Sequence, residues 1–262
     1  MTSSTVRLSE NDGVAPAPVS YLARLIDVLE ALGEEPETPR RLSEIASRTG
    51  IPLSTASRLV LLLSERRLVR RSAGGGYSLG PRLYELALRG LSCLADLDAL
   101  EAAVRRLARV TGESASAGLL LGDSVVLVAR RDSEHRLRMS ARVGDVVDAY
   151  RSAMGKAVLA HLGPEQRLEV LAATVGPDAQ GVLRVLEPEL EDVRREGFAR
   201  DEETYAPGLR CRAAAILGVN GVAFGAISVA GPAGRFTPDA AEAATQRLLA
   251  ETTALSLAGA AA

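Results

Sequence analysis

The sequence predicts an α+β protein with an N-terminal helical domain and a C-terminal domain that mixes helices and strands. Three observations lead to this prediction. Apolar residues recur at helical spacing in three short segments before residue 66, a triple glycine separates two extended runs near residue 75, and mixed strand and helix patterns begin near residue 98. At 262 residues the chain is long enough for two domains that each bury a core.

The first three helices are predicted from apolar spacing and from the residues at their ends. Ser20 can cap a helix with apolar residues at i, i+3, i+4 and i+7, which stops near Gly33. The segment "LSEIASRTG" predicts a second helix that ends at Gly50. Pro52 suits the first position of a third helix, where its missing N–H costs nothing. Two extended runs in "LVRRSAGGGYSLG" then predict a hairpin, which completes a winged helix-turn-helix.

The elements that follow are predicted by the same reasoning. A narrow apolar stripe from Pro81 to about Leu97 predicts a linker helix, which could also take part in a dimer. A helix over 99–110 then leads to "ASAGLLL" and "SVVLVAR", two strands joined at Gly122-Asp123. Further helices are expected near 153–162, 164–173 and 187–196, strands near 211–218 and 223–230, and a last helix from Thr237 and Pro238.

These patterns divide the chain into four parts. The N-terminal segment is polar and has no periodic apolar residues, which is typical of disorder. The predicted parts are a disordered tail over residues 1–19, a winged helix-turn-helix over 20–80, a linker helix over 81–97, and an α+β domain over 98–262.

Charge and composition exclude several classes of protein. The net charge of −2 excludes a generally basic protein, but eight arginines and two glutamates between Arg40 and Arg71 give a local charge of +6. Cys93 and Cys211 lie far apart and have no metal-ligand spacing, so no disulfide framework, metal or cofactor is expected. Without a signal sequence or a long apolar run, we expect a cytoplasmic protein with no membrane partner.

The segment "GIPLSTASRLVLLLSERRLVRR" combines an apolar stripe with polar and basic ends. A recognition helix needs both, because one face docks on its own domain while short polar groups and arginine reach base edges. A plain surface helix is the alternative for this segment alone; the turn, the hairpin and the basic patch together favour DNA. The residues predicted to contact DNA are Arg40, Arg41, Ser54, Thr55, Ser57, Arg58, Arg66, Arg67, Arg70, Arg71 and Tyr77, with the four arginines near the hairpin placed on phosphates.

The segment "SAMGKA" is not a phosphate-binding loop, because Tyr150 and Ala157 stand where that motif requires Gly and Ser or Thr. Ser152 can cap a helix there, and either simple capping or a small anion or carbonyl at the helix start fits the pattern. Cys211 is expected to be a small buried residue, because neither histidine lies in a motif that would activate it. No other catalytic motif is found, so no catalytic residue is predicted.

Several motifs in a fixed order resemble the IclR family of bacterial transcriptional regulators over about Tyr21 to Thr252. They include "RLSEIASRTGIPLSTASRLVLLLSERRLVRR", "YSLGPRLYELA", "SAMGKAVLA", "PGLRCRAAAI", "GAISVAGP" and "RFTPD". The resemblance implies a dimer, or a dimer of dimers, that binds a palindromic DNA operator. It also implies a C-terminal domain similar to GAF or PAS folds that binds a small effector, commonly an organic acid or aromatic metabolite. The implied effector residues are Met154, Gly155, Asp201, Cys211 and Ser228.

The chain departs from the family pattern near that implied pocket. It has "DAYRSA" before "MGKA", which places Asp148, Tyr150 and Arg151 near the pocket mouth, and Ala230 where well-known members carry a polar residue. These differences change the polarity around a ligand, so a larger or less polar effector than a 2-oxo acid becomes an option.

Three functions are compatible with these observations. A ligand-responsive DNA-binding regulator accounts for most of the motifs. A DNA-binding protein whose C-terminal domain only oligomerises is the first alternative. An enzyme built on the C-terminal pocket is the second, and the sequence offers it no base or nucleophile.

Overall fold

The computed structural model describes residues 21–91 and 95–259, which form two compact units that divide between residues 93 and 94. The predicted tail, the Ser20 cap, Cys93 and part of the predicted linker helix lie outside the described residues. No described helix is both long and apolar enough to cross a membrane.

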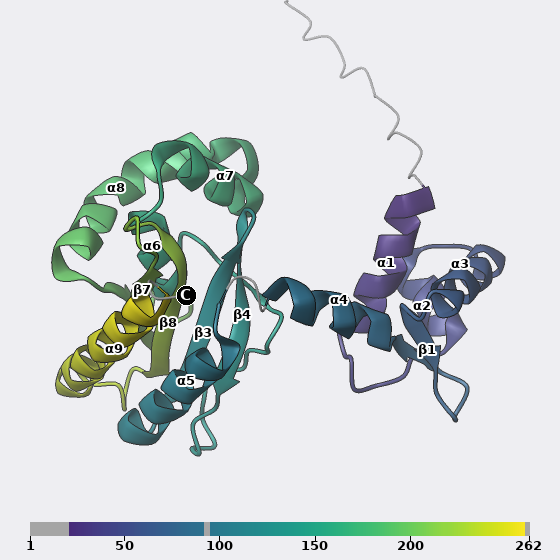
Figure 1. Cartoon of the computed structure of the whole chain (residues 1–262), viewed down its shortest axis with the longest axis horizontal. Helices are drawn as coiled ribbons and strands as arrows, with labels where there is room; N and C mark the ends of the chain where they lie inside the picture. The colour runs from purple at the N-terminus through teal and green to yellow at the C-terminus, as the bar shows by residue number, and fades with distance from the viewer. Residues whose placement is uncertain (1–20, 92–94, 260–262) are drawn as a thin grey trace, which may run out of the picture. The chain divides into compact units, whose positions relative to one another are not determined.

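The N-terminal unit is built from short helices and a hairpin, as predicted (Figure 1). Helix α2 ends at Gly50, whose φ of 66° reverses the chain, and α3 begins directly after Pro52. The two strands pair antiparallel with Val69 opposite Leu79. The elements are α1 (Tyr21–Gly33), α2 (Leu42–Thr49), α3 (Leu53–Glu65), β1 (Val69–Arg71), β2 (Tyr77–Leu79) and α4 (Pro81–Leu91).

One apolar core holds these helices together. Val28 and Leu32 of α1, Ile45 of α2, and Leu59 and Leu63 of α3 are buried in it. They fall at helical spacing, so the pattern that predicted each helix also marks the face that it buries. The core leaves the opposite face of α3 in solvent.

Helix α4 is shorter than the linker helix that the sequence predicted. It ends at Leu91, and the next described helix begins at Leu97. None of its described residues is fully buried, and Tyr84, Leu86 and Leu88 are exposed. This agrees with an apolar stripe that is too narrow to form a core of its own.

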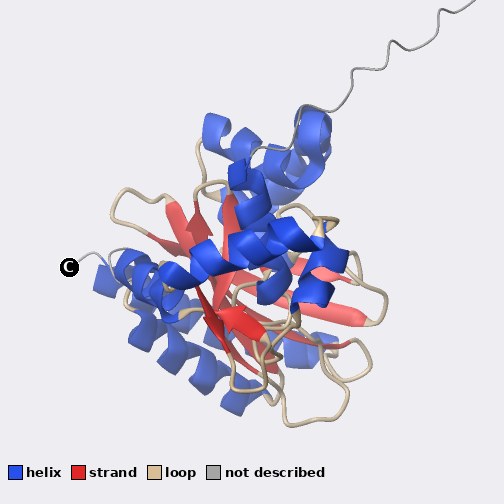
Figure 2. Cartoon of the chain, turned by 90° about the vertical axis from the view of Figure 1, so that its right-hand side faces the viewer, coloured by secondary structure: helices blue, strands red, loops and turns tan. Residues whose placement is uncertain are grey.

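The C-terminal unit is a six-stranded antiparallel sheet with helices on both faces (Figures 1 and 2). Its strand order is β5-β4-β3-β8-β7-β6. The strands are β3 (Ser114–Leu121), β4 (Ser124–Arg131), β5 (Val146–Val147), β6 (Ala199–Glu202), β7 (Leu209–Leu217) and β8 (Ala223–Pro232). Helices α5 (Leu97–Thr111) and α9 (Pro238–Gly259) pack side by side, while α6 (Ala153–Ala160), α7 (Pro164–Val175) and α8 (Ala179–Glu196) cover the other face. The predicted α+β class is confirmed.

Three features differ from the elements that the sequence predicted. Helix α8 begins at Ala179 and carries Pro188 inside it, whereas the prediction began the helix near residue 187. Proline is expected at a helix start rather than in its interior, which explains the error. Strands β5 and β6 were not predicted, because two to four residues are too few to show an alternating pattern.

Candidate functional site

Helix α3 presents the predicted base-reading residues to solvent. Ser54, Ser57 and Arg58 are exposed and Thr55 is partly exposed, while Ala56 and Leu59 are buried on the opposite side. This separation follows from 3.6 residues per turn, which places the polar positions off the apolar stripe. The helix therefore exposes a short polar face, while its apolar face is buried in the core of the N-terminal unit.

The hairpin carries a second exposed group of basic residues. Arg66, Arg70 and Arg71 are exposed, and the guanidinium of Arg71 lies 6.0 Å from the centre of the Tyr77 ring. Arg67 is exposed too, but its Nη2 donates to Glu85 Oε1 at 3.2 Å. Arg66, Arg70 and Arg71 thus have no acidic partner among the described residues, whereas Arg67 is paired with Glu85.

Arg40 lies differently from what the sequence predicted. Its side chain is only 6% exposed, and its Nη2 lies 3.3 Å from Glu34 Oε2 and 3.7 Å from Glu35 Oε2. Its backbone exchanges two hydrogen bonds with Tyr77, at 2.8 and 2.7 Å. Arg40 thus fastens the segment before α2 to the hairpin, and its burial argues against the DNA contact that the sequence predicted. The neighbouring Arg41 remains exposed.

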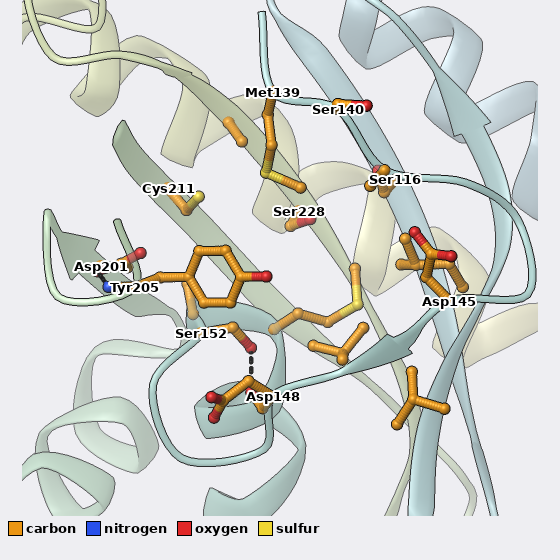
Figure 3. Close-up of a pocket in the computed structure, with 17 residues that line it drawn as sticks. Ser116, Met139, Ser140, Asp145, Asp148, Ser152, Asp201, Tyr205, Cys211 and Ser228 are labelled. Atoms are coloured by element: carbon orange, nitrogen blue, oxygen red, sulfur yellow. Dashed lines mark hydrogen bonds between the residues drawn. The ribbon is translucent and has the colours of Figure 1, made fainter. Parts of the chain in front are cut away.

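The C-terminal unit contains a pocket of about 300 Å³ between the sheet and the start of α6 (Figure 3). Met154, Asp201, Cys211 and Ser228 line it, as the resemblance implied for them. Its floor is the first turn of α6, and a loop over residues 139–148 closes one side. The further polar side chains on its walls are Ser116, Ser140, Asp145, Asp148, Ser152 and Tyr205.

The start of α6 is held by Ser152, as predicted. Its Oγ accepts the Gly155 N–H at 3.0 Å and donates to the Asp148 carbonyl at 2.6 Å. Gly155 itself does not line the pocket, contrary to the expectation. A Cβ at this position would lie 2.3 Å from the Ala149 carbonyl oxygen, so the glycine lets the preceding loop pack directly on the helix.

Asp201 is the most unusual group in the pocket. Its side chain is fully buried, and its Oδ1 accepts the N–H groups of Thr204 at 2.8 Å and Tyr205 at 3.1 Å. The other oxygen, Oδ2, is buried without a hydrogen-bond partner among the described residues. A buried carboxylate oxygen without a partner is costly, so a hydrogen-bond donor placed against Oδ2 would stabilise it.

Cys211 stands opposite Asp201 on the neighbouring strand β7. Burial raises the pKa of its thiol to about 12, and the Asp201 carboxylate adds to the shift. The thiol therefore stays protonated at neutral pH, whereas a cysteine nucleophile needs a lowered pKa. Cys211 lines the pocket, and it is partly exposed rather than buried as the sequence predicted.

Arg130 organises the upper wall of the pocket. Its Nη1 donates to Ser116 Oγ at 3.0 Å and its Nη2 to the Met139 carbonyl at 2.7 Å, while its Nε binds Asp132 at 2.8 Å. No motif in the sequence pointed to Ser116, Met139 or Tyr205, because they reach the pocket from a strand and two loops that only the tertiary structure brings together.

The segment before α6 fits the expected pocket mouth only in part. Asp148 lines the pocket, and Ala230 does as well. Tyr150, in contrast, packs against the apolar core, and the Arg151 Nη2 donates to the Thr204 and Tyr205 carbonyls, both at 3.2 Å. Among the described residues there is no group of three or more His, Cys, Asp and Glu side chains that could hold a metal ion.

Both units match models of the same family. The model described as bacterial transcriptional regulator IclR C-terminal matches residues 95–257, and the IclR helix-turn-helix domain matches residues 21–73. The regulator KdgR of Dickeya chrysanthemi is 30% identical over 229 residues, which cover 86% of this chain and 74% of KdgR. The transcriptional repressor IclR of Escherichia coli is 30% identical over 238 residues and 86% of each chain.

Solved structures agree with these matches. An IclR homolog from Microbacterium hydrocarbonoxydans, complexed with 4-hydroxybenzoate, superposes with a TM-score of 0.75 at 27% identity, over 93% of this chain and all of that one. The IclR of Thermotoga maritima gives a TM-score of 0.71 at 26% identity, and the match covers 91% of this chain and 98% of that one. These relatives are regulators, which decides against the enzyme alternative. The chain belongs to the IclR family of bacterial transcriptional regulators and is a DNA-binding regulator of the IclR type.

Proposed function

We propose that this regulator binds a palindromic operator as a dimer or tetramer and responds to a small molecule in the C-terminal pocket. The observation that carries the proposal is the fully buried Asp201, whose Oδ2 has no partner among the described residues and lines that pocket. A domain that only oligomerises has no need of a cavity with an unsatisfied polar wall. DNA as the partner implies a cytoplasmic location.

In this proposal α3 enters the major groove with its polar face toward the bases. Ser54, Thr55, Ser57 and Arg58 read base edges, because short polar side chains and arginine make those contacts. Contacts to phosphate and sugar fall to the exposed basic residues around this helix, namely Arg41, Arg66, Arg67, Arg70 and Arg71, with Tyr77 beneath Arg71.

The pocket supplies the signal. The Microbacterium homolog complexed with 4-hydroxybenzoate supports a small organic ligand for this chain. A ligand changes DNA affinity only if it binds one arrangement of the dimer better than another, and such coupling typically amounts to about 1–3 kcal/mol. Exposed apolar residues on α4, Tyr84, Leu86 and Leu88, offer a surface for the partner protomer.

Footprinting the DNA upstream of the protein's own gene and its neighbours, with and without a metabolite extract, tests the proposal. We expect a protected palindrome whose protection changes when the extract is added. Protection that no fraction of the extract alters would favour the alternative in which the C-terminal domain only oligomerises.

A further inference from the structure

Arg67 has a backbone conformation that favours glycine, yet it carries a long charged side chain. It lies two residues after the end of α3 and has a φ of 60°, in the left-handed region. Glycine adopts this conformation without the steric cost that a Cβ brings. The backbone therefore does not explain an arginine at this position, and the reason for it lies in the contacts that Arg67 makes.

Arg67 binds helix α4 through both its backbone and its side chain. Its carbonyl oxygen accepts the N–H of Arg82 at 3.1 Å, in the first turn of α4, where backbone N–H groups lack acceptors within the helix. Its Nη2 donates to Glu85 Oε1 at 3.2 Å, about one turn further along the same helix. Gly80 permits this approach, because a Cβ there would collide with the Arg67 carbonyl oxygen. The junction that follows α3 is thus attached to the start of α4 through one residue.

Glu85 is a carboxylate that two arginines share. Its Oε1 accepts from Arg67, and its Oε2 accepts from Arg82 Nη1 at 2.9 Å. The hydrogen bond from Arg82 and the charges of both arginines lower the pKa of Glu85, so its carboxylate stays charged at neutral pH. The side chain of Arg67 is 65% exposed and that of Glu85 37% exposed, so a phosphate can reach the pair from solvent. It would meet an arginine whose charge is already partly neutralised.

The other arginines near the hairpin differ from Arg67 in this respect. Arg66, Arg70 and Arg71 are exposed and have no acidic partner in the part of the chain that the structure describes. An exposed ion pair is weak, so Glu85 does not prevent a phosphate contact by Arg67. It lowers the affinity that this contact adds, because the phosphate must compete with the carboxylate for the same guanidinium.

We propose that Glu85 limits the DNA affinity of this regulator by holding Arg67 on α4. Glu85 is a positioning residue in this account, because it contacts Arg67 and not DNA. The inference rests on the proposed DNA contacts of the basic residues around α3, and it adds a residue that regulates them. Since α4 is the last described helix before the boundary between the two units, a movement of α4 away from α3 would release Arg67 for phosphate.

A double-mutant cycle on Arg67 and Glu85 tests the proposal. Binding of the full-length protein to a duplex of arbitrary sequence is followed by fluorescence anisotropy over a range of salt concentrations, because phosphate contacts do not depend on sequence. Glu85→Gln should raise the affinity by about threefold or more. It should also steepen the slope of log affinity against log salt concentration, by up to about 0.9 for one phosphate contact.

Arg67→Gly is the partner variant, because glycine adopts the observed backbone conformation and only the side chain is lost. In the parent protein it should reduce DNA affinity by less than about twofold, whereas in the Glu85→Gln background it should remove most of the gain. An equal loss in the two backgrounds would overturn the proposal. So would a Glu85→Gln protein that binds DNA no more tightly than the parent.

Glu65→Gln is the matched control for the loss of one negative charge. Glu65 is exposed at the end of α3, two residues before Arg67, and no described residue forms an ion pair with it. Any gain from removing this acid should be the same with and without the Arg67 side chain. A Glu65→Gln gain that depends on Arg67 as strongly as the Glu85→Gln gain would overturn the proposal, because general electrostatics would then account for both.

Arg70→Ala separates this inference from the proposed function. If Arg70→Ala reduces the salt slope while Glu85→Gln has no effect through Arg67, the role of Glu85 is wrong and the proposed DNA surface stands. If Arg70→Ala also leaves the salt slope unchanged, the proposed phosphate contacts are wrong together with the inference that rests on them.

Discussion

Asp201 and Cys211 face each other across the β6–β7 pair at the wall of the pocket, with the carboxylate fully buried and the thiol held protonated. The pair explains why a cysteine in a ligand pocket needs no catalytic role. It also places an acceptor and a weak donor next to each other, which is an arrangement for recognising a ligand rather than for attacking one.

This relationship predicts a distinctive pH dependence of the thiol. The folded pKa of Cys211, about 12, is raised from the ordinary 9.0, so the folded state holds the proton more tightly than the unfolded state. The resulting stability is fully present below pH 9 and is lost as the pH rises from about 9 toward 12. Iodoacetamide labelling of the Cys93→Ser protein should therefore be slow at pH 8 and accelerate only above about pH 10. Asp201→Asn should move that rise to lower pH, and fast labelling at pH 8 would contradict the assignment.

Arg58 is expected to determine operator discrimination. It is exposed on the polar face of α3, where a bidentate contact to guanine would be worth about 1–3 kcal/mol. Arg58→Ala should reduce specific binding by about tenfold or more and leave non-specific binding close to that of the parent protein. A footprint identical to that of the parent would show that Arg58 makes no base contact.

Arg70 and Arg71 are expected to supply affinity without selectivity. Both are exposed on β1, and neither has an acidic partner among the described residues. Arg70→Ala or Arg71→Ala should weaken specific and non-specific DNA binding alike. Each should also reduce the slope of log affinity against log salt concentration by the amount that about one phosphate contact contributes. Fluorescence anisotropy titrations over a range of salt concentrations measure this slope. A slope equal to that of the parent protein would rule out the phosphate contact.

Arg40 should behave in the opposite way to its neighbour Arg41. Arg40→Ala removes a buried side chain that contacts Glu34 and Glu35, so it should lower the stability of the N-terminal unit by about 1–3 kcal/mol and leave the salt slope of DNA binding unchanged. Arg41→Ala should leave the stability of the N-terminal unit nearly unchanged and reduce the salt slope of DNA binding, because Arg41 is exposed. Denaturant unfolding and salt titration of both variants separate the two effects. If Arg40→Ala reduced the salt dependence of DNA binding as much as Arg41→Ala does, Arg40 would have to contact DNA after all.

Gly155 should tolerate no side chain. A Cβ there would meet the Ala149 carbonyl oxygen at 2.3 Å, so Gly155→Ala must displace either α6 or the loop that carries Asp148. We expect a loss of roughly 1–3 kcal/mol in thermal unfolding, together with weaker ligand binding. Gly163→Ala is the control, since nothing lies within 4 Å of its added Cβ. Equal unfolding temperatures for both variants would contradict the packing role.

The sequence predicted what local patterns determine. The helices of the N-terminal unit follow from apolar spacing, and the Gly122-Asp123 turn lies between β3 and β4 as expected. It could not show that Arg40 is buried, because Glu34, Glu35 and Tyr77 meet Arg40 only in the folded unit. The residues of the pocket were also predictable only in part. Family motifs pointed to Asp201 and Cys211, whereas Ser116 and Tyr205 arrive from parts of the chain with no motif.

The most direct test compares the wild-type protein with Asp201→Asn on the operator found by footprinting. Operator affinity is measured by fluorescence anisotropy with and without the metabolite fraction that changes wild-type protection. We predict that the fraction shifts wild-type affinity by at least about fivefold and leaves the affinity of Asp201→Asn unchanged. An equal shift in both proteins would contradict the account, because the signal would then be sensed outside the pocket that Asp201 lines.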